Sequence, residues 1–281
     1  LYAACYFPEY ENEYEVINVQ PISFTIDNTR KVMVPVGQYG VQLAGYLSNI
    51  FAEKKFVGMF DRIITDLGIE GVDYVSSALA EYILLFPEKK RDEGVLLADV
   101  GYISSTLCLG KGDGLLDMKS FSMGGGYIEA DLCEALDIPY SQAQQLKRKV
   151  IVSLDAGDDE MYEISVGDKI RSFSAKTVNE IVRYRLGVIA KTLVCISACD
   201  VKMPDYAPLY LTGGGIAFMH GVKDELSNTL KRPVEIVVPP MPQVGYPDKS
   251  SGWGLMDMIL NNVMPEKENF INKIINKIKN R

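Results

Sequence analysis

The run of three glycines at residues 213–215 is the feature that most constrains this chain. It follows an apolar stretch that includes Tyr210 and Leu211 and precedes a segment with helical character from Met219 to Leu230. A strand that ends in consecutive glycines and leads into a helix lets bare backbone approach a ligand, because no Cβ atom stands in the way. The pattern therefore predicts a strand, a tight turn and a helix, although glycine clusters also form ordinary turns.

A second strand and turn strengthen the interpretation. Leu96–Val100 reads as a buried strand that ends in Asp-x-Gly, with Asp99 and Gly101, and the hydroxyl residues Ser104, Ser105 and Thr106 follow. A nucleoside triphosphate needs donors for its oxygens and a metal that a carboxylate commonly holds through water. We therefore predict that these residues bind phosphate and that Asp99 holds Mg²⁺. The alternative is a plain strand and hairpin with polar edge residues.

The nucleoside would then lie between the glycine run and a helix. Gly213, Gly214, Gly215 and Ile216 are expected to face the adenosine or the α-phosphate. The helix that carries Gln144, Gln145 and Lys147 would place Gln144 and Lys147 near the nucleoside. For Lys147 the alternative is a solvated basic face formed with Arg148 and Lys149. Together the two turns predict a two-lobed cleft for ATP and Mg²⁺.

Composition excludes several classes of function. The formal net charge of −8 argues against general nucleic-acid binding, which needs a basic surface. No run of eighteen apolar residues is present, so we expect no membrane-spanning helix. The five cysteines form no CxxC pair and are expected to be reduced thiols in a cytoplasmic protein. The single histidine, His220, leaves little room for histidine-based catalysis.

Strands alternate with helices along the chain, which indicates an α/β protein. The segment 41–51 is either a strand or the start of a helix, and 88–93 is expected to be a charged surface loop. The remaining expected strands lie at 16–26, 31–35, 95–100 and 234–238, a hairpin turn at 110–114, and helices at 74–85, 128–136, 141–149 (capped by Ser141), 174–199 and 252–262.

The C-terminal segment combines an apolar stripe with basic residues on an otherwise acidic chain. The apolar members are Phe270, Ile271, Ile274, Ile275 and Ile278, and the basic ones include Lys273 and Lys277. Such a pattern is typical of a helix that lies in a membrane interface. The alternatives are a helix packed on the body or a disordered tail.

Taken together, these residues resemble the bacterial cell-division family FtsA. The resemblance spans nearly the whole chain, and its motifs occur in the family's order. They lie at residues 34–43, 77–80, 93–101, 124–132, 211–215 and 232–239.

The resemblance implies an α/β, actin-like (ribonuclease-H-like) two-lobed fold with a small inserted α+β subdomain. Residues 1–55 would form the insert, 56–115 the rest of the first lobe, 116–262 the second lobe and 263–281 the tail. Because the chain begins at Leu1 without the family's first phosphate motif, we expect it to be N-terminally truncated.

The family further implies binding of ATP with Mg²⁺, self-association into filaments and binding of the C-terminal peptide of FtsZ. The tail would attach the protein to the inner face of the cytoplasmic membrane at the division site. The FtsZ peptide would dock on the segment Ile151–Ile189, where Arg171, Arg183 and Arg185 would meet acidic groups or remain solvated.

The sequence departs from the family at two places in the expected cleft. Tyr102 and Ile103 stand where the phosphate turn usually has two glycines, and their bulk would crowd the γ-phosphate. Gln144 replaces the family's acidic residue in the nucleoside helix. We therefore expect a nucleotide-binding scaffold that is at most a weak ATPase. The alternatives are a PilM-like pilus-assembly adaptor, which resembles the segment 99–106 about as well, and a sugar-kinase-type phosphotransferase, which lacks a catalytic Asp candidate.

Overall fold

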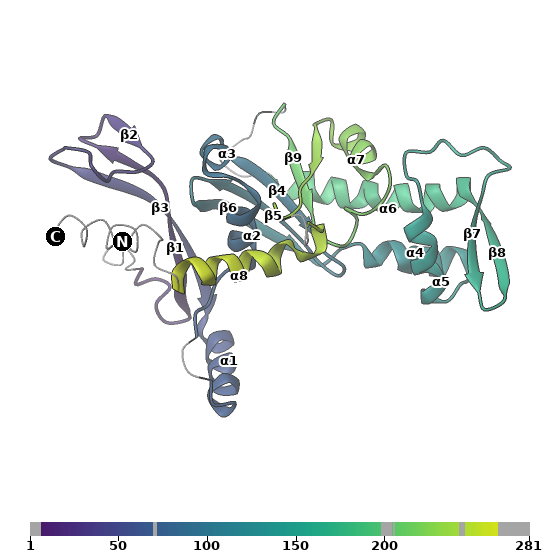
Figure 1. The fold of residues 1–281 in the computed structure, drawn as a ribbon, viewed down its shortest axis with the longest axis horizontal. Helices are drawn as coiled ribbons and strands as arrows, with labels where there is room; N and C mark the ends of the chain where they lie inside the picture. The colour runs from purple at the N-terminus through teal and green to yellow at the C-terminus, as the bar shows by residue number, and fades with distance from the viewer. Residues whose placement is uncertain (1–6, 70–71, 198–203, 205, 242–244, 264–281) are drawn as a thin grey trace, which may run out of the picture.

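The computed structural model describes residues 7–69, 72–197, 204, 206–241 and 245–263 of the chain. Within these residues it contains a three-stranded sheet, a five-stranded sheet and a two-stranded hairpin. Figure 1 shows the three-stranded sheet at one end of the molecule, the hairpin at the other and the five-stranded sheet between them. The expected mixture of strands and helices is therefore confirmed.

The N-terminal sheet is antiparallel, in the order β2-β1-β3. Its strands are β1 (Tyr14–Ile26), β2 (Arg30–Val32) and β3 (Leu43–Glu53), and the helix α1 (Lys54–Asp66) follows. The turn between β1 and β2 holds Asp27 and Asn28 at φ 52° and 57°, the positive values that a tight hairpin turn requires. Most of the segment 41–51 thus belongs to strand β3. Helix α1 was not predicted, although its apolar residues recur at helical spacing, and it projects away from the body (Figure 1).

The central sheet has the order β10-β9-β4-β5-β6. Its first three strands in the chain are the antiparallel β4 (Val95–Val100), β5 (Ser105–Lys111) and β6 (Gly114–Phe121), whereas β9 (Leu209–Thr212) and β10 (Val234–Ile236) join in parallel. Because β6 crosses the boundary expected at residues 115/116 and the sheet takes strands from both sides, the chain does not divide into two sheets there.

Both faces of the central sheet are covered. One face packs on α4 (Gly126–Leu136), α5 (Tyr140–Lys149), α6 (Ala175–Ile196) and α7 (Val222–Leu230), and the other on α2 (Ser77–Leu85) and α8 (Ser250–Val263). Strand β4 serves both cores, with Leu96 and Ala98 on one face and Val95 and Leu97 on the other. A strand buried on two faces reads as a continuous apolar run, which is why it was visible in the sequence.

Three local expectations need correction. Residues 88–93 form the short helix α3 (Glu88–Glu93), since a charged segment between Pro87 and Gly94 can complete a helical turn. Helix α5 begins at Tyr140 after Pro139 and has no side-chain cap, so Ser141 lies inside its first turn. The hairpin β7 (Met161–Val166) and β8 (Lys169–Ser174) was not expected at all. A serine cap does occur on another helix: Ser174 caps α6, and its hydroxyl accepts a hydrogen bond from the N–H of Thr177.

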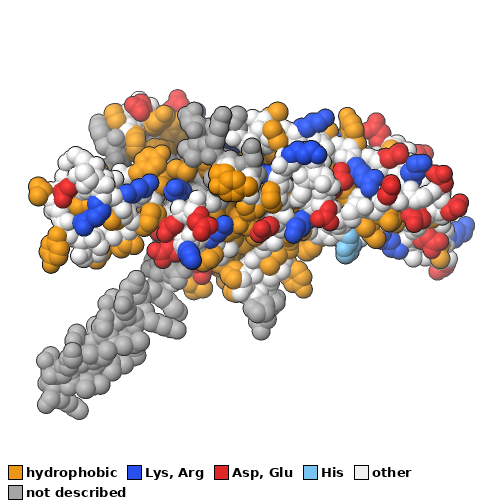
Figure 2. Space-filling model, turned by 90° about the horizontal axis from the view of Figure 1, so that it is seen from above, with side chains coloured by type: hydrophobic (Ala, Val, Ile, Leu, Met, Phe, Trp, Pro, Cys, Tyr) orange, Lys and Arg blue, Asp and Glu red, His pale blue; other side chains and the backbone are white. Residues whose placement is uncertain are grey.

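The expected membrane tail lies outside the described residues, apart from the end of α8 at Val263. Among the described residues, no helix is both long and apolar enough to cross a membrane. Figure 2 shows charged side chains of both signs gathered toward the end of the molecule that carries β7 and β8, with hydrophobic side chains more frequent over the middle.

Helices α2 and α8 touch backbone to backbone. A Cβ atom added at Gly254 in α8 would lie 2.6 Å from the carbonyl carbon of Ala80 in α2, whereas one added at Gly252 meets nothing within 4 Å. Of these two glycines, Gly254 is the one that the close approach requires, because Gly252 faces open space on the same helix.

We therefore expect Gly254→Ala to lower the free energy of unfolding by about 1–3 kcal/mol through overpacking, measured by urea denaturation. The matched control is Gly252→Ala, which should be neutral or stabilise by up to roughly 1 kcal/mol because alanine favours the helix. Equal effects of the two substitutions would show that the α2–α8 contact does not constrain the fold.

Candidate nucleotide site

Three glycine turns meet at the carboxyl ends of β4 and β9. Asp99 and Thr212 lie side by side in these parallel strands, so the turns that follow them share one edge of the sheet. A Cβ atom on Gly215 would lie 2.1 Å from the carbonyl oxygen of Gly101, and one on Gly125 would lie 2.0 Å from the carbonyl oxygen of Gly215. The glycines are thus required for the turns to pack on one another.

The backbone donors of these turns are largely used within the protein. The N–H of Gly215 donates to the carbonyl of Val100 at 2.8 Å, and that of Gly125 donates to the carbonyl of Gly101 at 2.9 Å. The N–H of Gly213 donates to the carbonyl of Pro247 at 3.2 Å. Gly213 and Gly215 therefore shape the predicted adenosine turn rather than donate to a ligand, and the exposed Gly214 is the member open to solvent.

The phosphate turn between β4 and β5 differs in this respect. The backbone N–H groups of Tyr102, Ile103 and Ser104 have no hydrogen-bond partner among the described residues. The side chains of Tyr102 and Ile103 are exposed by 45% and 69%. Successive free N–H groups in a turn form a concave site for an anion. The turn has the donors that a phosphate needs, with two bulky side chains beside them.

The predicted hydroxyl ligands do not all reach this turn. Ser105 is buried and donates its hydroxyl to the carbonyl of Met123 at 2.6 Å, and the hydroxyl of Thr106 lies 2.8 Å from that of Ser120 on β6. Ser104 is exposed beside the free N–H groups. Of the three, Ser104 is the one whose side chain is exposed at this turn.

Asp99 belongs to a buried acidic cluster that the sequence analysis missed. Burial and the charge of Asp99 raise the pKa of Glu81, on α2, to about 8, and burial also raises the pKa of Asp99. Glu81 accepts a hydrogen bond from the Ser250 hydroxyl, which lies 3.0 Å from that of Thr212. Two carboxylates that repel one another in a dry environment favour a proton or a cation between them.

The acidic cluster fits Mg²⁺ better than a metal that needs many protein ligands. No group of three or more His, Cys, Asp or Glu side chains able to hold a metal occurs in the part of the chain that the structure describes. Mg²⁺ commonly takes one or two carboxylates and completes its shell with water and phosphate oxygens. A glutamate in the middle of the apolar helix at 77–85 was the sequence signal for Glu81.

Lys147 does not form the solvated basic face that was one of the two sequence alternatives. It is buried, whereas Arg148 and Lys149 are exposed, so it does not belong to a solvated basic face. Its ammonium group donates to the carbonyl of Gly125 at 2.8 Å and to Oε1 of Glu129 at 3.2 Å. Burial lowers the pKa of Lys147, and the Glu129 carboxylate opposes that shift. Lys147 thus stabilises the glycine turn at Gly125 through this bond. Gln144 lies half-buried on the same helix.

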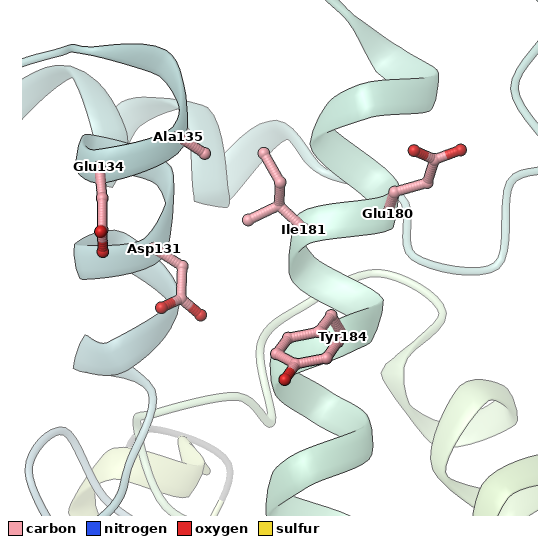
Figure 3. Close-up of a pocket in the computed structure, with 6 residues that line it drawn as sticks. All are labelled: Asp131, Glu134, Ala135, Glu180, Ile181 and Tyr184. Carbon is pink, nitrogen blue, oxygen red and sulfur yellow. The ribbon is translucent and has the colours of Figure 1, made fainter.

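A separate groove lies between α4 and α6 (Figure 3). Its volume is about 530 Å³, and its lining combines carboxylates with apolar and aromatic side chains. The lining residues are Asp131, Glu134, Ala135, Glu180, Ile181 and Tyr184.

The three arginines expected to meet an acidic peptide already have partners. Arg185 holds the Asp131 carboxylate with two bonds of 2.6 and 2.7 Å. Arg183 donates to the carbonyls of Val152 and Leu154, and Arg171 donates to Gln142. The groove that Arg185 reaches through Asp131 is itself lined by carboxylates and by apolar and aromatic side chains.

Comparison with solved structures places the fold in the actin-like class. The chain superposes on MreB 5 of Spiroplasma citri bound to AMPPNP with a TM-score of 0.60 and 14% identity, covering 79% of this chain and 68% of that one. It superposes on a chain of the PilM-PilN type IV pilus biogenesis complex with a TM-score of 0.56 and 18% identity, covering 92% and 68%. At these identities the likeness shows the fold alone.

Sequence comparison defines the family. The profile of the cell division protein FtsA matches residues 96–254, more than half of the 281 residues, and that of the SHS2 domain inserted in FtsA matches residues 1–51. The chain belongs to the FtsA family of cell-division proteins and is a divergent member.

Two curated relatives show how far the chain diverges. FtsA of Bacillus subtilis is 23% identical over 255 residues, which cover 89% of this chain and 58% of that protein. FtsA of Helicobacter pylori is 24% identical over 249 residues, covering 84% and 50%. The chain thus spans about half the length of these relatives.

The acidic cluster makes a prediction about pH. Between the ordinary value of 4.5 and about 8, folded Glu81 holds its proton more than the unfolded chain does, so its contribution to stability is full below about pH 4.5 and is lost as the pH rises through 8. We expect Glu81→Gln to raise the free energy of unfolding at pH 8 and to reduce its decline above pH 5, measured by urea denaturation without divalent metal.

The control is Glu88→Gln on the exposed start of α3, which should keep the wild-type pH dependence. A Glu81→Gln profile parallel to that of the wild type would mean that the acidic cluster is not protonated in the folded state.

Proposed function

We propose that this chain is part of an FtsA-type division scaffold that binds ATP with Mg²⁺ and hydrolyses it slowly or not at all. The observation that carries the proposal is the run of free N–H groups at Tyr102, Ile103 and Ser104. It follows the strand that bears Asp99, whose carboxylate interacts with that of the buried Glu81. Donors for phosphate and carboxylates for its metal thus come from one edge of the sheet.

In this proposal each part of the site has one role. The N–H groups at 102–104 and the Ser104 hydroxyl bind phosphate oxygens, and Asp99 and Glu81 hold Mg²⁺ through its water shell. The metal, when bound, neutralises the charge of the phosphates. The glycines at 213–215 carry no side chains, so the backbone can approach the nucleoside closely on that side of the cleft. The bulk of Tyr102 and Ile103 beside the turn is the reason to expect weak binding and little hydrolysis.

The scaffold role rests on membership of the FtsA family. We propose that the protein self-associates into filaments and joins FtsZ to the inner face of the cytoplasmic membrane at the division site. The amphipathic pattern of residues 270–278 supports membrane attachment, since each basic residue near an anionic surface contributes on the order of 1 kcal/mol. The expected domain boundaries, other than 115/116, remain part of this proposal.

The groove between α4 and α6 is the surface that we propose for the C-terminal peptide of FtsZ. Ile181 and Tyr184 offer apolar contact, and the exposed Glu134 and Glu180 favour a peptide that brings basic side chains. The sequence analysis expected acidic groups of the peptide to meet Arg171, Arg183 and Arg185. We propose basic groups of the peptide instead, because these arginines already bind partners within the protein.

The nucleotide proposal is tested by calorimetric titration of the full-length protein with ATP and Mg²⁺. We expect weak binding by the wild type and binding about tenfold tighter or more in Tyr102→Gly/Ile103→Gly, where the crowding is removed and the turn keeps its N–H groups. Asp99→Asn should remove the dependence of binding on Mg²⁺. If neither the wild type nor the double variant binds, the cleft is not a nucleotide site.

The peptide proposal is tested by titrating a labelled FtsZ C-terminal peptide. Tyr184→Ala and Glu180→Lys should each weaken binding about tenfold, through lost apolar contact and through reversed charge respectively. Tyr46→Ala, a tyrosine of similar exposure on β3, serves as the control and should bind as the wild type does. Unchanged binding in both groove variants would exclude this groove.

A further inference from the structure

Helix α1 has two apolar faces, and one of them is left exposed. On the first face Val57 is buried, and its carbonyl accepts a hydrogen bond from the Tyr74 hydroxyl at 3.4 Å. The second face is a stripe of apolar side chains that recur at helical spacing and are 37–69% exposed. The members of this α1 stripe are Phe56, Met59, Phe60, Ile63 and Leu67. Because α1 projects from the body (Figure 1), the stripe is open to a helix or a membrane.

The segment before β1 brings negative charge to the start of α1. The backbone N–H of Lys54 donates to the carbonyl of Glu13 at 2.9 Å, and its ammonium group donates to the carbonyl of Glu11 at 2.6 Å. The side chains of Glu9, Glu11 and Glu13 are exposed. The charged residues of α1 itself nearly balance; they are Lys54, Lys55, Asp61, Arg62 and Asp66. The surroundings therefore repel an anionic lipid surface and attract a basic amphipathic helix.

A small pocket beside the start of α1 also fits a basic side chain. Its volume is about 320 Å³, and its lining includes Tyr10, Glu11, Tyr14 and Glu15. Lys54 also lines the pocket, but its ammonium group is bound to the carbonyl of Glu11. Aromatic faces beside carboxylates favour the cationic end of a lysine or an arginine.

The chain itself carries a segment with this combination of features. Beyond α8 the apolar residues of 270–278 recur at the spacing of the α1 stripe, with Lys273 and Lys277 among them. Met258 of α8 and Ile50 of β3 pack on one core cluster, and α1 follows β3 directly, so α8 ends on the side of the molecule that carries α1 (Figure 1). Residues 264–269 span up to about 20 Å when extended, which allows the following residues to reach α1.

We propose that residues 270–278 dock on the α1 stripe while the protein is away from the membrane. Their apolar side chains cover the stripe, and their lysines face the acidic segment before β1. The same apolar side chains are then withheld from lipid, so membrane attachment requires them to leave α1. This inference rests on the proposed membrane attachment and adds a closed state that opposes it.

The direct test is photo-crosslinking of the full-length protein with benzoylphenylalanine in place of Met59. We expect cross-links to residues 270–278 within one copy, and we expect vesicles of phosphatidylethanolamine and phosphatidylglycerol to abolish them. The matched control places the same group at Thr65, which is exposed on the side of α1 opposite the stripe, and should not cross-link to these residues. Cross-links from position 59 to a second copy, or none to residues 270–278, would overturn the proposal.

Binding to the same vesicles gives an independent result. Met59→Gln/Ile63→Gln removes apolar contact from two exposed positions without adding charge. We expect this variant to bind the vesicles about fivefold more tightly than the wild type, because residues 270–278 are no longer held on α1. Thr65→Gln should bind as the wild type does.

The direction of the change separates the occupants of the α1 stripe. Weaker binding by the double variant would assign the stripe to the membrane itself, and unchanged binding would remove its role in attachment; either result overturns the proposal. If neither protein binds vesicles while the cross-link to residues 270–278 is present, the proposed membrane attachment fails and the docking on α1 stands.

Discussion

Backbone-on-backbone contact between glycine turns is the constraint on which the rest of this structure depends. Gly101, Gly125 and Gly215 come from three parts of the chain. The backbone of Gly101 occupies the place of a side chain on Gly215, and the backbone of Gly215 occupies that of a side chain on Gly125. Their N–H groups bond to neighbouring carbonyls, which joins β4, β9 and the start of α4 at one edge of the sheet. Any side chain at these positions would separate the elements, because the space is already taken by backbone atoms.

Two buried charge clusters lie on opposite sides of this contact. Asp99 and Glu81 gather negative charge on the face covered by α2 and α8, where Ser250 and Thr212 provide hydroxyl groups. Glu129 and Lys147 form an ion pair on the other face, among α4 and α5. Buried charges need compensation, so the same arrangement that is costly for an isolated protein is suited to binding a charged ligand.

The strongest sequence patterns predicted the elements that carry the site. The apolar run before Asp99 identified β4, and the glycine run identified the turn after β9, because both reflect local needs of burial and backbone space. Helix α1 and the hairpin β7–β8 were missed although each carries its period: α1 has apolar residues at helical spacing, and β7 alternates exposed with buried residues. Ser105 and Thr106 looked like phosphate ligands because a sequence does not show which way a side chain points.

By itself the sequence determined the order of the glycine turns and the identity of Asp99 as a strand-end carboxylate, and its resemblance to the FtsA family implied the actin-like class. The turns and the strand end follow from periodicity and from the steric freedom of glycine, which act over a few residues. Only the tertiary structure decided that Glu81 joins Asp99, that Lys147 turns inward to Glu129, and that the N–H groups free to bind lie at residues 102–104. Those facts depend on which partners long-range packing brings within hydrogen-bond distance, and no local pattern encodes that distance.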